Sequence, residues 1–204
     1  YINKNYQWNI VTVEDPIEYL FTSDRSSINQ REVGSDTNSF ARAMRSMFRE
    51  DVNAVMIGEM RDPETIATAL TAAETGHLIF SSLHTNNASQ TIDRIIDAFP
   101  GSQQTQVRAQ LAGSLVAIVS QRLITRLQGG LIPAIEIMIA NNAIRNLIRE
   151  NKTYEIDLMI EMESQEGMVS LNRSLASLVK KGEISMESAM SYSLNPAELK
   201  SLIR

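Results

Sequence analysis

The chain has 204 residues, of which 43% are hydrophobic and 21% are charged, and its formal net charge at pH 7 is −5. This length and composition suit one folded domain, or a domain with a small appendage, and they exclude intrinsic disorder. No run of five or six basic residues occurs, so the sequence lacks the positive patch that nucleic acid phosphates require. The absence of cysteine excludes disulfides and thiolate metal sites.

The sequence carries no membrane or export signal. No apolar stretch approaches the ~20 residues that a membrane-spanning helix needs, and we therefore expect a soluble chain. The first residue is Tyr1 rather than a methionine, and no signal peptide precedes the polar residues 3–5. We expect this sequence to be a piece of a longer protein.

Three short apolar runs predict buried strands, at residues 10–13, 54–57 and 78–83. Helical patterns separate these runs, and such alternation is typical of a parallel sheet with crossover helices. We therefore expect an α/β fold.

Two helices are predicted between these strands. The first has Asp36 or Thr37 as its N-cap, with Phe40, Met44, Met47 and Phe48 on one face. The second has Asp62 as its N-cap, Pro63 at its first position and Gly76 just beyond its end. Two further helices are predicted at about residues 88–98 and 103–126.

A turn at residues 129–130 and a strand at residues 131–139, which contains Pro133, come next. From residue 141 onward almost all of the pattern is helical. It includes an apolar face made by Leu171, Leu175 and Leu178, a stop at Gly182, and a capping arrangement at residues 195–198. We place a subdomain boundary near residue 140.

The first strand, residues 10–13, runs directly into three carboxylates, Glu14, Asp15 and Glu18. In an open parallel sheet, ligands bind beyond the carboxyl ends of the strands. Glu18 or Glu14 could then polarise a nucleophile beside a phosphate group. The alternative is a strand that leaves the core and turns polar at Pro16.

The second strand, residues 54–57, is followed by Gly58 and Glu59. An apolar strand that ends in a carboxylate is typical of a Walker B element, whose acid holds the Mg²⁺ ion that bridges nucleotide phosphates. Taken alone, the same pattern also describes a plain buried strand.

Both histidines of the chain flank the third strand, His77 before it and His84 after it. A separation of seven residues is not typical of zinc ligands, so we do not expect a zinc site here. Two interpretations stay open: hydrogen-bonded structural residues, or residues that sense or orient a phosphate group.

The order of these three segments resembles the secretion and type IV pilus ATPases. The Asp box of that family is similar to residues 14–18, its Walker B box to residues 57–62, and its His box to residues 74–77 and 83–86. The similarity also takes in residues 29–34 and 92–94, so it covers nearly the whole chain.

This resemblance implies the architecture. It implies a RecA-like P-loop NTPase core, truncated, over residues 1–140 and a helical C-terminal subdomain over residues 141–204. The family's glycine-rich Walker A loop is absent, because no glycine of the sequence precedes a lysine. The resemblance implies that this loop and a PAS-like domain lie upstream of a helix similar to residues 1–6. A second departure is at residues 128–133, where relatives often have a longer glycine run and a basic residue.

The resemblance also implies roles for single residues. Glu18 would be the catalytic base that orients water towards the γ-phosphate of ATP, and Glu59 would belong to the Mg²⁺ shell. Thr75 and His84 would report on the γ-phosphate. The other expected contributors are nucleotide-binding Asp15 and Arg61, and supporting Glu14, His77 and Arg94. An arginine should also face the phosphates, and the candidates are Arg31, Arg61 and Arg94.

Residues 143–150 resemble the signature of the retraction branch of this family. The assembly branch commonly carries a cysteine-rich zinc insertion, which this chain has no cysteine to form. Within the predicted helix, Ile144, Leu147 and Ile148 share one face and Arg145 and Arg149 the other. We expect the two arginines to act in coupling, the alternative being an ordinary surface helix with solvated arginines.

The family resemblance implies a homo-oligomer, with a hexamer expected, docked on inner-membrane pilus machinery at the cytoplasmic face. Two rival interpretations stay open. One is a type II secretion or pilus-assembly ATPase of the same family. The other is a non-enzymatic oligomerisation module that lacks its phosphate-binding loop. Under the ATPase interpretation, we expect the 204-residue chain alone to be inactive in ATP hydrolysis, because it has no such loop.

Overall fold

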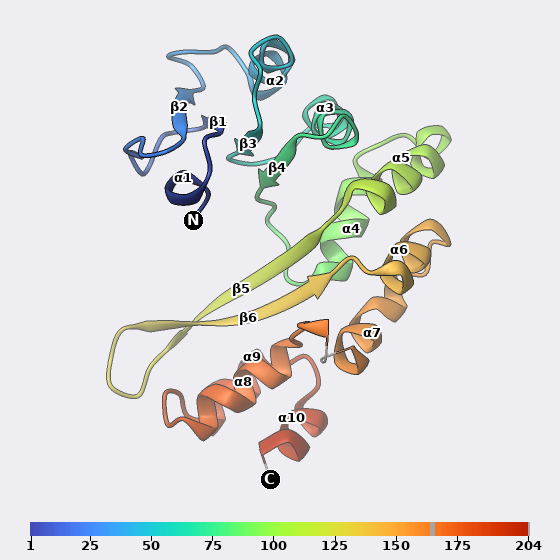
Figure 1. Cartoon of the computed structure of the whole chain (residues 1–204). Coiled ribbons are helices and arrows are strands. Elements are labelled where there is room, and N and C mark those ends of the chain that lie inside the picture. The colour runs from blue at the N-terminus through green and yellow to red at the C-terminus, as the bar shows by residue number, and fades with distance from the viewer. Residues whose placement is uncertain (164–165, 204) are drawn as a thin grey trace. The chain divides into compact units, whose positions relative to one another are not determined.

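The structure is a computed structural model that describes residues 1–163 and 166–203. Its contacts divide the chain into two compact units, of which the first contains Tyr1–His84 and Ile95–Ser114. The second contains Thr85–Arg94 and Leu115–Arg204. Figure 1 labels the helices and strands of both units. Among the described helices, none combines the length and the apolar character needed to cross a membrane.

The first unit is built on a sheet of four parallel strands in the spatial order β2-β1-β3-β4. The strands are β1 (Asn9–Glu14), β2 (Ser27–Glu32), β3 (Ala54–Ile57) and β4 (Leu78–Ser81). Strands β1, β3 and β4 confirm the three predicted strands, although β4 ends at Ser81 rather than at residue 83. The apolar pattern does not predict β2, which forms one edge of the sheet.

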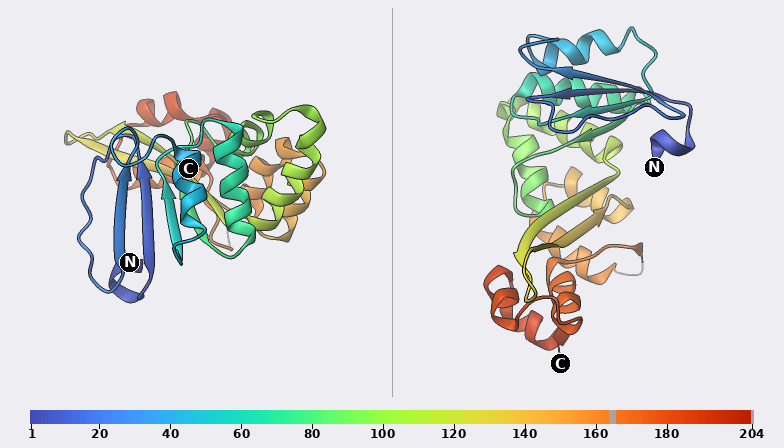
Figure 2. Two further views of the ribbon diagram at one scale, coloured as in Figure 1. Left: turned by 90° about the horizontal axis from the view of Figure 1, so that it is seen from above. Right: turned by 90° about the vertical axis from the view of Figure 1, so that its left-hand side faces the viewer.

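Helices cover one face of this sheet. The unit contains α1 (Ile2–Asn5), α2 (Phe40–Met47), α3 (Pro63–Glu74) and α5 (Gly101–Ser114), while α4 (Ala88–Asp97) begins in the second unit. Helices α2 and α3 lie against the sheet, as Figure 2 shows. Since side chains alternate along a strand, alternate residues of β1 and β3 face these helices. The resulting core contains Val11, Val13, Val55 and Ile57 from the strands and Ala43, Met44, Met47, Ala69 and Ala72 from the helices.

The ends of these helices follow the predicted signals in part. Asp62 caps α3 by accepting hydrogen bonds from the Thr65 backbone N–H at 2.8 Å and the Thr65 hydroxyl at 2.7 Å. Gly76 follows α3 with a φ of +97°, which glycine adopts without strain. The N-cap predicted for α2 is wrong, because Ser39 rather than Asp36 or Thr37 accepts from the Arg42 N–H.

The helix predicted over residues 103–126 is wrong in its second half. Helix α5 ends at Ser114, and strand β5 (Ala117–Thr125) follows. β5 pairs in antiparallel register with β6 (Leu131–Ile139) along its whole length. Branched residues such as Ile118, Val119 and Ile124 favour this pairing over a helix. The predicted strand at residues 131–139 is confirmed, with Pro133 tolerated because a two-stranded ribbon leaves each strand a free edge.

The rest of the second unit is helical, and α8 packs against β6. The helices after β6 are α6 (Asn142–Arg149), the 3₁₀ helix η1 (Thr153–Glu155), α7 (Ile156–Met162), α8 (Leu171–Lys180), α9 (Met186–Tyr192) and α10 (Pro196–Ile203). This confirms the helical pattern predicted after residue 141. Gly182 ends α8 with a φ of +69°, and Asn195 caps α10 through the Glu198 N–H at 3.3 Å.

The contact division differs from the boundary expected near residue 140. Ile124 of β5 and Ala134 of β6 are fully buried in one apolar cluster with Leu171 and Leu175 of α8. The ribbon and the C-terminal helices therefore share a core, and the structure groups them in one unit.

Candidate functional site

A cavity of about 620 Å³ lies where β1, β3 and β4 end, entirely within the first unit. Because the three strands are parallel, their carboxyl ends meet at one edge of the sheet, where open α/β sheets bind ligands. This edge brings together six of the predicted site residues: Glu14, Asp15, Glu18, Glu59, Arg61 and His84.

Glu14, the last residue of β1, is a buried and fixed carboxylate. Its Oε1 atom accepts hydrogen bonds from the Thr12 hydroxyl at 2.6 Å and from the Gln30 side-chain amide at 2.9 Å. Asp15 and Glu18 lie beyond the strand and are exposed. Of the two acids considered as a base, Glu18 therefore has free access to a ligand, whereas Glu14 is committed to its neighbours.

Glu59 is the centre of a cluster of three predicted residues. Its Oε2 atom accepts from Arg61 Nε at 2.6 Å and lies 3.3 Å from His84 Nε2. The Glu59 side chain is only 14% exposed, whereas those of Arg61 and His84 are 70% and 76% exposed. A sheltered carboxylate is thus flanked by two groups that can face a ligand from solvent.

Backbone pairing fixes the position of this cluster. The Gly58 N–H donates to Val13 O at 2.8 Å, and the Met60 N–H donates to Ser82 O at 3.2 Å, so β3 and its neighbours are tied together beyond their regular ends. A Cβ atom at Gly58 would lie 3.2 Å from Val13 O, which is tighter than ordinary contact. The glycine before Glu59 therefore allows β1 and β3 to approach closely at the site.

Four residues of the cavity were not identified from the sequence: Phe40, Phe80, Ser81 and Ser82. Within the described part of the chain, the buried Ser81 hydroxyl has no hydrogen-bond partner. A buried polar group without a partner is costly, so Ser81 is an unsatisfied polar group in the wall of the cavity. The sequence signal was the polar pair that ends an apolar strand beside the histidine segment.

The charges of the cavity indicate what kind of ligand it suits. Four carboxylates and one arginine line it, which would repel a polyphosphate unless a cation lies between them. No group of three or more potential metal ligands is formed by the described residues. Mg²⁺ fits this donor set, because it is commonly bound through one or two carboxylates, with phosphate oxygens and water completing its shell.

Other predicted residues lie elsewhere. Thr75 and His77 precede β4, so they lie at the opposite edge of the sheet, about 13 Å away along a strand of this length. The Thr75 hydroxyl there lies 3.2 Å from His77 Nδ1 and donates to α3 carbonyls. The structure therefore does not bring Thr75 to the cavity.

The remaining arginine candidates are also outside the cavity. Arg31 forms a bidentate pair with Glu50, at 3.1 and 2.6 Å, and this hydrogen bonding holds the pKa of Glu50 below its usual range. Arg94 is an exposed residue of α4 in the second unit. Of the three candidates, Arg61 alone lines the cavity.

The two arginines of α6 differ in their surroundings. Arg145 donates from Nε to Ala140 O and from Nη2 to Leu115 O, both at 2.8 Å. Arg149 is exposed and bonds to the Asn146 side chain at 2.8 Å. The alternative of two solvated arginines on an ordinary surface helix therefore does not fit Arg145, whereas Arg149 is exposed. Ile144 and Ile148 are fully buried on the other side of the helix.

Known proteins are similar to this chain in sequence and in fold. The chain is 50% identical over 190 residues to a twitching motility protein of Neisseria gonorrhoeae, covering 93% of this chain and 51% of that protein. It is 49% identical over 189 residues to the type IV pilus retraction ATPase PilT of Pseudomonas aeruginosa, covering 93% and 55% respectively. A crystal structure of the pilus retraction motor PilT with bound ADP superposes with a TM-score of 0.90 at 50% identity, over 98% of this chain and 57% of that one.

The chain thus spans about half the length of the relatives it matches. Residues 1–131, which include the whole cavity, match the family described as type II/IV secretion system protein. Together with the parallel sheet and its acidic carboxyl edge, this match decides the assignment. The chain belongs to the type II/IV secretion system protein family.

Proposed function

We propose that this chain is the catalytic part of an ATP-hydrolysing motor subunit that drives type IV pilus retraction. The observation that carries the proposal is the cluster of Glu59, Arg61 and His84 beside Glu18, at the carboxyl edge of a parallel sheet. The relatives named for twitching motility and for pilus retraction support the same reading.

The residues divide the chemistry among them. Glu18, exposed at the cavity, orients water towards the γ-phosphate and accepts its proton. Glu59 would belong to the Mg²⁺ shell, and its neighbours Arg61 and His84 are exposed enough to contact the phosphates. Mg²⁺, when bound, would supply the positive charge that offsets repulsion between the phosphates and the four carboxylates. Asp15, which is exposed at the cavity, provides a further polar contact.

The motor works as a homo-oligomer, which we expect to be a hexamer, on pilus machinery at the cytoplasmic face of the inner membrane. Ring ATPases convert nucleotide state into rigid-body rotation of domains, which requires neighbouring subunits. Retraction rather than assembly is supported by residues 143–150, with Arg149 exposed on α6 to meet a partner.

A chimera tests the proposal. The part of Pseudomonas PilT that precedes the matched region is joined to this chain, which supplies a phosphate-binding loop independently of the natural upstream sequence. We expect Mg²⁺-dependent ATP hydrolysis by the chimera and a rate at least about a hundredfold lower for the 204-residue chain alone, because the chain has no Gly-Lys loop to position the phosphates. Steady-state phosphate release measures both.

The outcomes separate the candidate functions. If the isolated chain hydrolyses ATP as fast as the chimera, the phosphate-binding loop is not needed to position the phosphates. A folded chimera without hydrolysis would favour the non-enzymatic module. A chimera that hydrolyses ATP but does not restore twitching to a Pseudomonas strain lacking its own PilT would point to secretion or pilus assembly.

A further inference from the structure

Two helical segments of the second unit carry opposite charge. Residues 153–163, which form η1 and α7, contain four carboxylates and no lysine or arginine. Residues 171–181, which form α8 and its C-cap, contain three cations and no acid. The net charge of the chain is −5, so its composition alone would not lead us to expect a helix that carries only positive charges.

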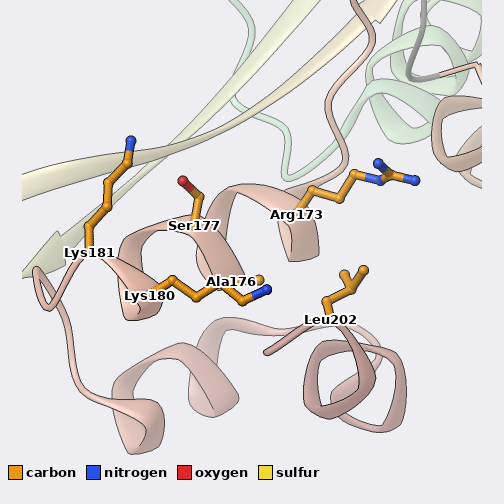
Figure 3. Close-up of a pocket in the computed structure, with 6 residues that line it drawn as sticks. All are labelled: Arg173, Ala176, Ser177, Lys180, Lys181 and Leu202. Atoms are coloured by element: carbon orange, nitrogen blue, oxygen red, sulfur yellow. The ribbon is translucent and has the colours of Figure 1, made fainter. Parts of the chain in front are cut away.

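The basic segment borders a hollow of about 360 Å³ between α8 and α10 (Figure 3). Arg173, Lys180 and Lys181 lie on the face of α8 that is turned away from the apolar core. Ala176 and Leu202 give the hollow an apolar floor. Among the described residues, no carboxylate forms an ion pair with Lys180 or Lys181, so both ammonium groups can meet an external acid.

The acidic segment presents an exposed apolar stripe. Tyr154, Leu158 and Met162, spaced four residues apart, are 73%, 60% and 69% exposed. Ile156 and Ile160, on the opposite side of α7, are fully buried, so the stripe is surplus to the core of the chain. Glu155 and Glu163 stand at its two ends. An exposed apolar row with acidic ends is a surface suited to a basic-rimmed hollow.

We propose that the stripe of one copy of this chain docks into the hollow of a second copy. Apolar side chains of α7 would meet Ala176 and Leu202, and the acids at its ends would meet Lys180 and Lys181. Because the two surfaces differ, the contact is head-to-tail, which is the type that generates rings when the rotation closes. The inference rests on the homo-oligomer of the proposed function and names the surfaces that join its subunits.

One helix against a helix pair is a small interface, so this contact alone is weak. We expect the 204-residue chain to self-associate with a Kd of about 100 µM or more, and to do so less as salt is raised from about 0.05 M to about 0.5 M. Sedimentation equilibrium over a concentration series, without nucleotide, measures both effects. The absence of nucleotide separates this test from that of ATP hydrolysis.

Charge reversal tests each surface. Lys180→Glu with Lys181→Glu, and separately Glu155→Lys with Glu163→Lys, should each weaken self-association at least about tenfold, because like charges then face each other. Mixing the two double variants should restore it, since each retains the surface that the other has lost. Lys4→Glu with Arg25→Glu, in the first unit, matches the first variant in charge and should have no effect.

Several results would overturn the proposal: a wild-type chain that stays monomeric at about 1 mM, association that neither reversal weakens, or a mixture that fails to restore it. A variant that melts early is replaced by its neutral form, Lys180→Gln with Lys181→Gln, and the same weakening is expected. Binding of the parent chain and of the lysine variants to vesicles of phosphatidylglycerol and phosphatidylcholine is measured as well. Lysine-dependent vesicle binding with unchanged self-association would assign the hollow to anionic lipid and refute the pairing of copies.

Discussion

Glu18 and Glu59 line one cavity in different surroundings. Glu59 is sheltered and bonded to Arg61 and His84, whereas Glu18 is exposed. In the PilT chimera, we expect Glu18→Gln to lower kcat at least about a hundredfold while ATP binding changes little, because the amide keeps the shape and loses the base. Glu59→Gln should instead raise the Mg²⁺ concentration needed for half-maximal turnover at least about tenfold.

Phosphate release across a Mg²⁺ series, with fluorescent-nucleotide binding in parallel, separates the two effects. Asp24→Asn, outside the cavity in the same part of the chain, should match the parent. Wild-type turnover by Glu18→Gln would remove Glu18 as the base, and Glu14 would be the next candidate.

Glu136 of β6 is a buried carboxyl whose Oε1 accepts from the Ala88 N–H, at the start of α4, at 2.8 Å. Burial raises its pKa, and the charge of Asp157 raises it further, against the lowering effect of the Ala88 hydrogen bond. The folded state therefore binds this proton more tightly than the unfolded state does. Between the ordinary pKa of the carboxyl and its raised value, the free energy of unfolding falls as pH rises.

Glu136→Gln should remove this pH dependence, because the amide oxygen can still accept from Ala88 and carries no charge. We expect the melting temperature of the variant to exceed that of the parent at about pH 8, with the gain shrinking towards about pH 5. Glu150→Gln is the control. Hydrogen bonding to Lys152 lowers the pKa of Glu150, so removing this carboxylate should not raise the melting temperature at high pH. An equal gain in melting temperature at both pH values would contradict a raised pKa of Glu136 as the cause.

Much of the site could be predicted at this scale. Acids that follow apolar strands lie at one edge because parallel strands end together, and this predicts Glu14, Glu18 and Glu59 as neighbours. Ser81 was missed because the predicted strand ran to residue 83, so the polar pair of Ser81 and Ser82 was counted inside the strand rather than at its end. The family resemblance gave Thr75 and His84 a shared role at the γ-phosphate, although β4 separates the two residues in space.

Among the elements, apolar runs predicted β1, β3, β4 and β6, and two strands without such a signal, β2 and β5, were missed. β2 reads Ser-Ile-Asn-Gln-Arg-Glu and is an edge strand with partly exposed residues, so no apolar run identifies it. β5 exposes alternate residues and follows α5 after only two residues, so the pattern continued the helix through it. Only five residues separate β5 from its partner β6, so the two strands form a local hairpin around the predicted turn at residues 129–130.

Helix α6 shows how one signature can mix structural and exposed groups. Arg145→Ala should cost about 1–2 kcal/mol of unfolding free energy, because the carbonyls of Ala140 and Leu115 lose a charged donor. Arg149→Ala should change it by less than about 0.5 kcal/mol, since Arg149 is exposed. Urea unfolding of the two variants checks the difference, and equal costs would refute the anchoring role of Arg145.

At the scale of the whole molecule, the contact division follows shared cores rather than the expected boundary near residue 140. Polar motifs located the site and apolar runs located the strands, but neither indicates which elements share a core. That depends on side chains such as Ile124 and Leu175, which lie 51 positions apart in the sequence yet are buried in one cluster. Non-local packing of this kind has no local sequence signal.

The assignment of Arg149 to coupling is a statement about the complete motor. An exposed arginine on a helix outside the cavity supplies no group that phosphoryl transfer requires, so its removal should leave hydrolysis within about twofold. We expect Arg149→Ala in the PilT chimera to stop twitching nevertheless, because the side chain is free to contact a partner that transmits force. Lys152→Ala, another exposed cation near α6, is the control and should twitch normally. Normal motility of Arg149→Ala would return the arginine to a solvated surface role, and loss of hydrolysis in a folded protein would place it in the catalytic machinery.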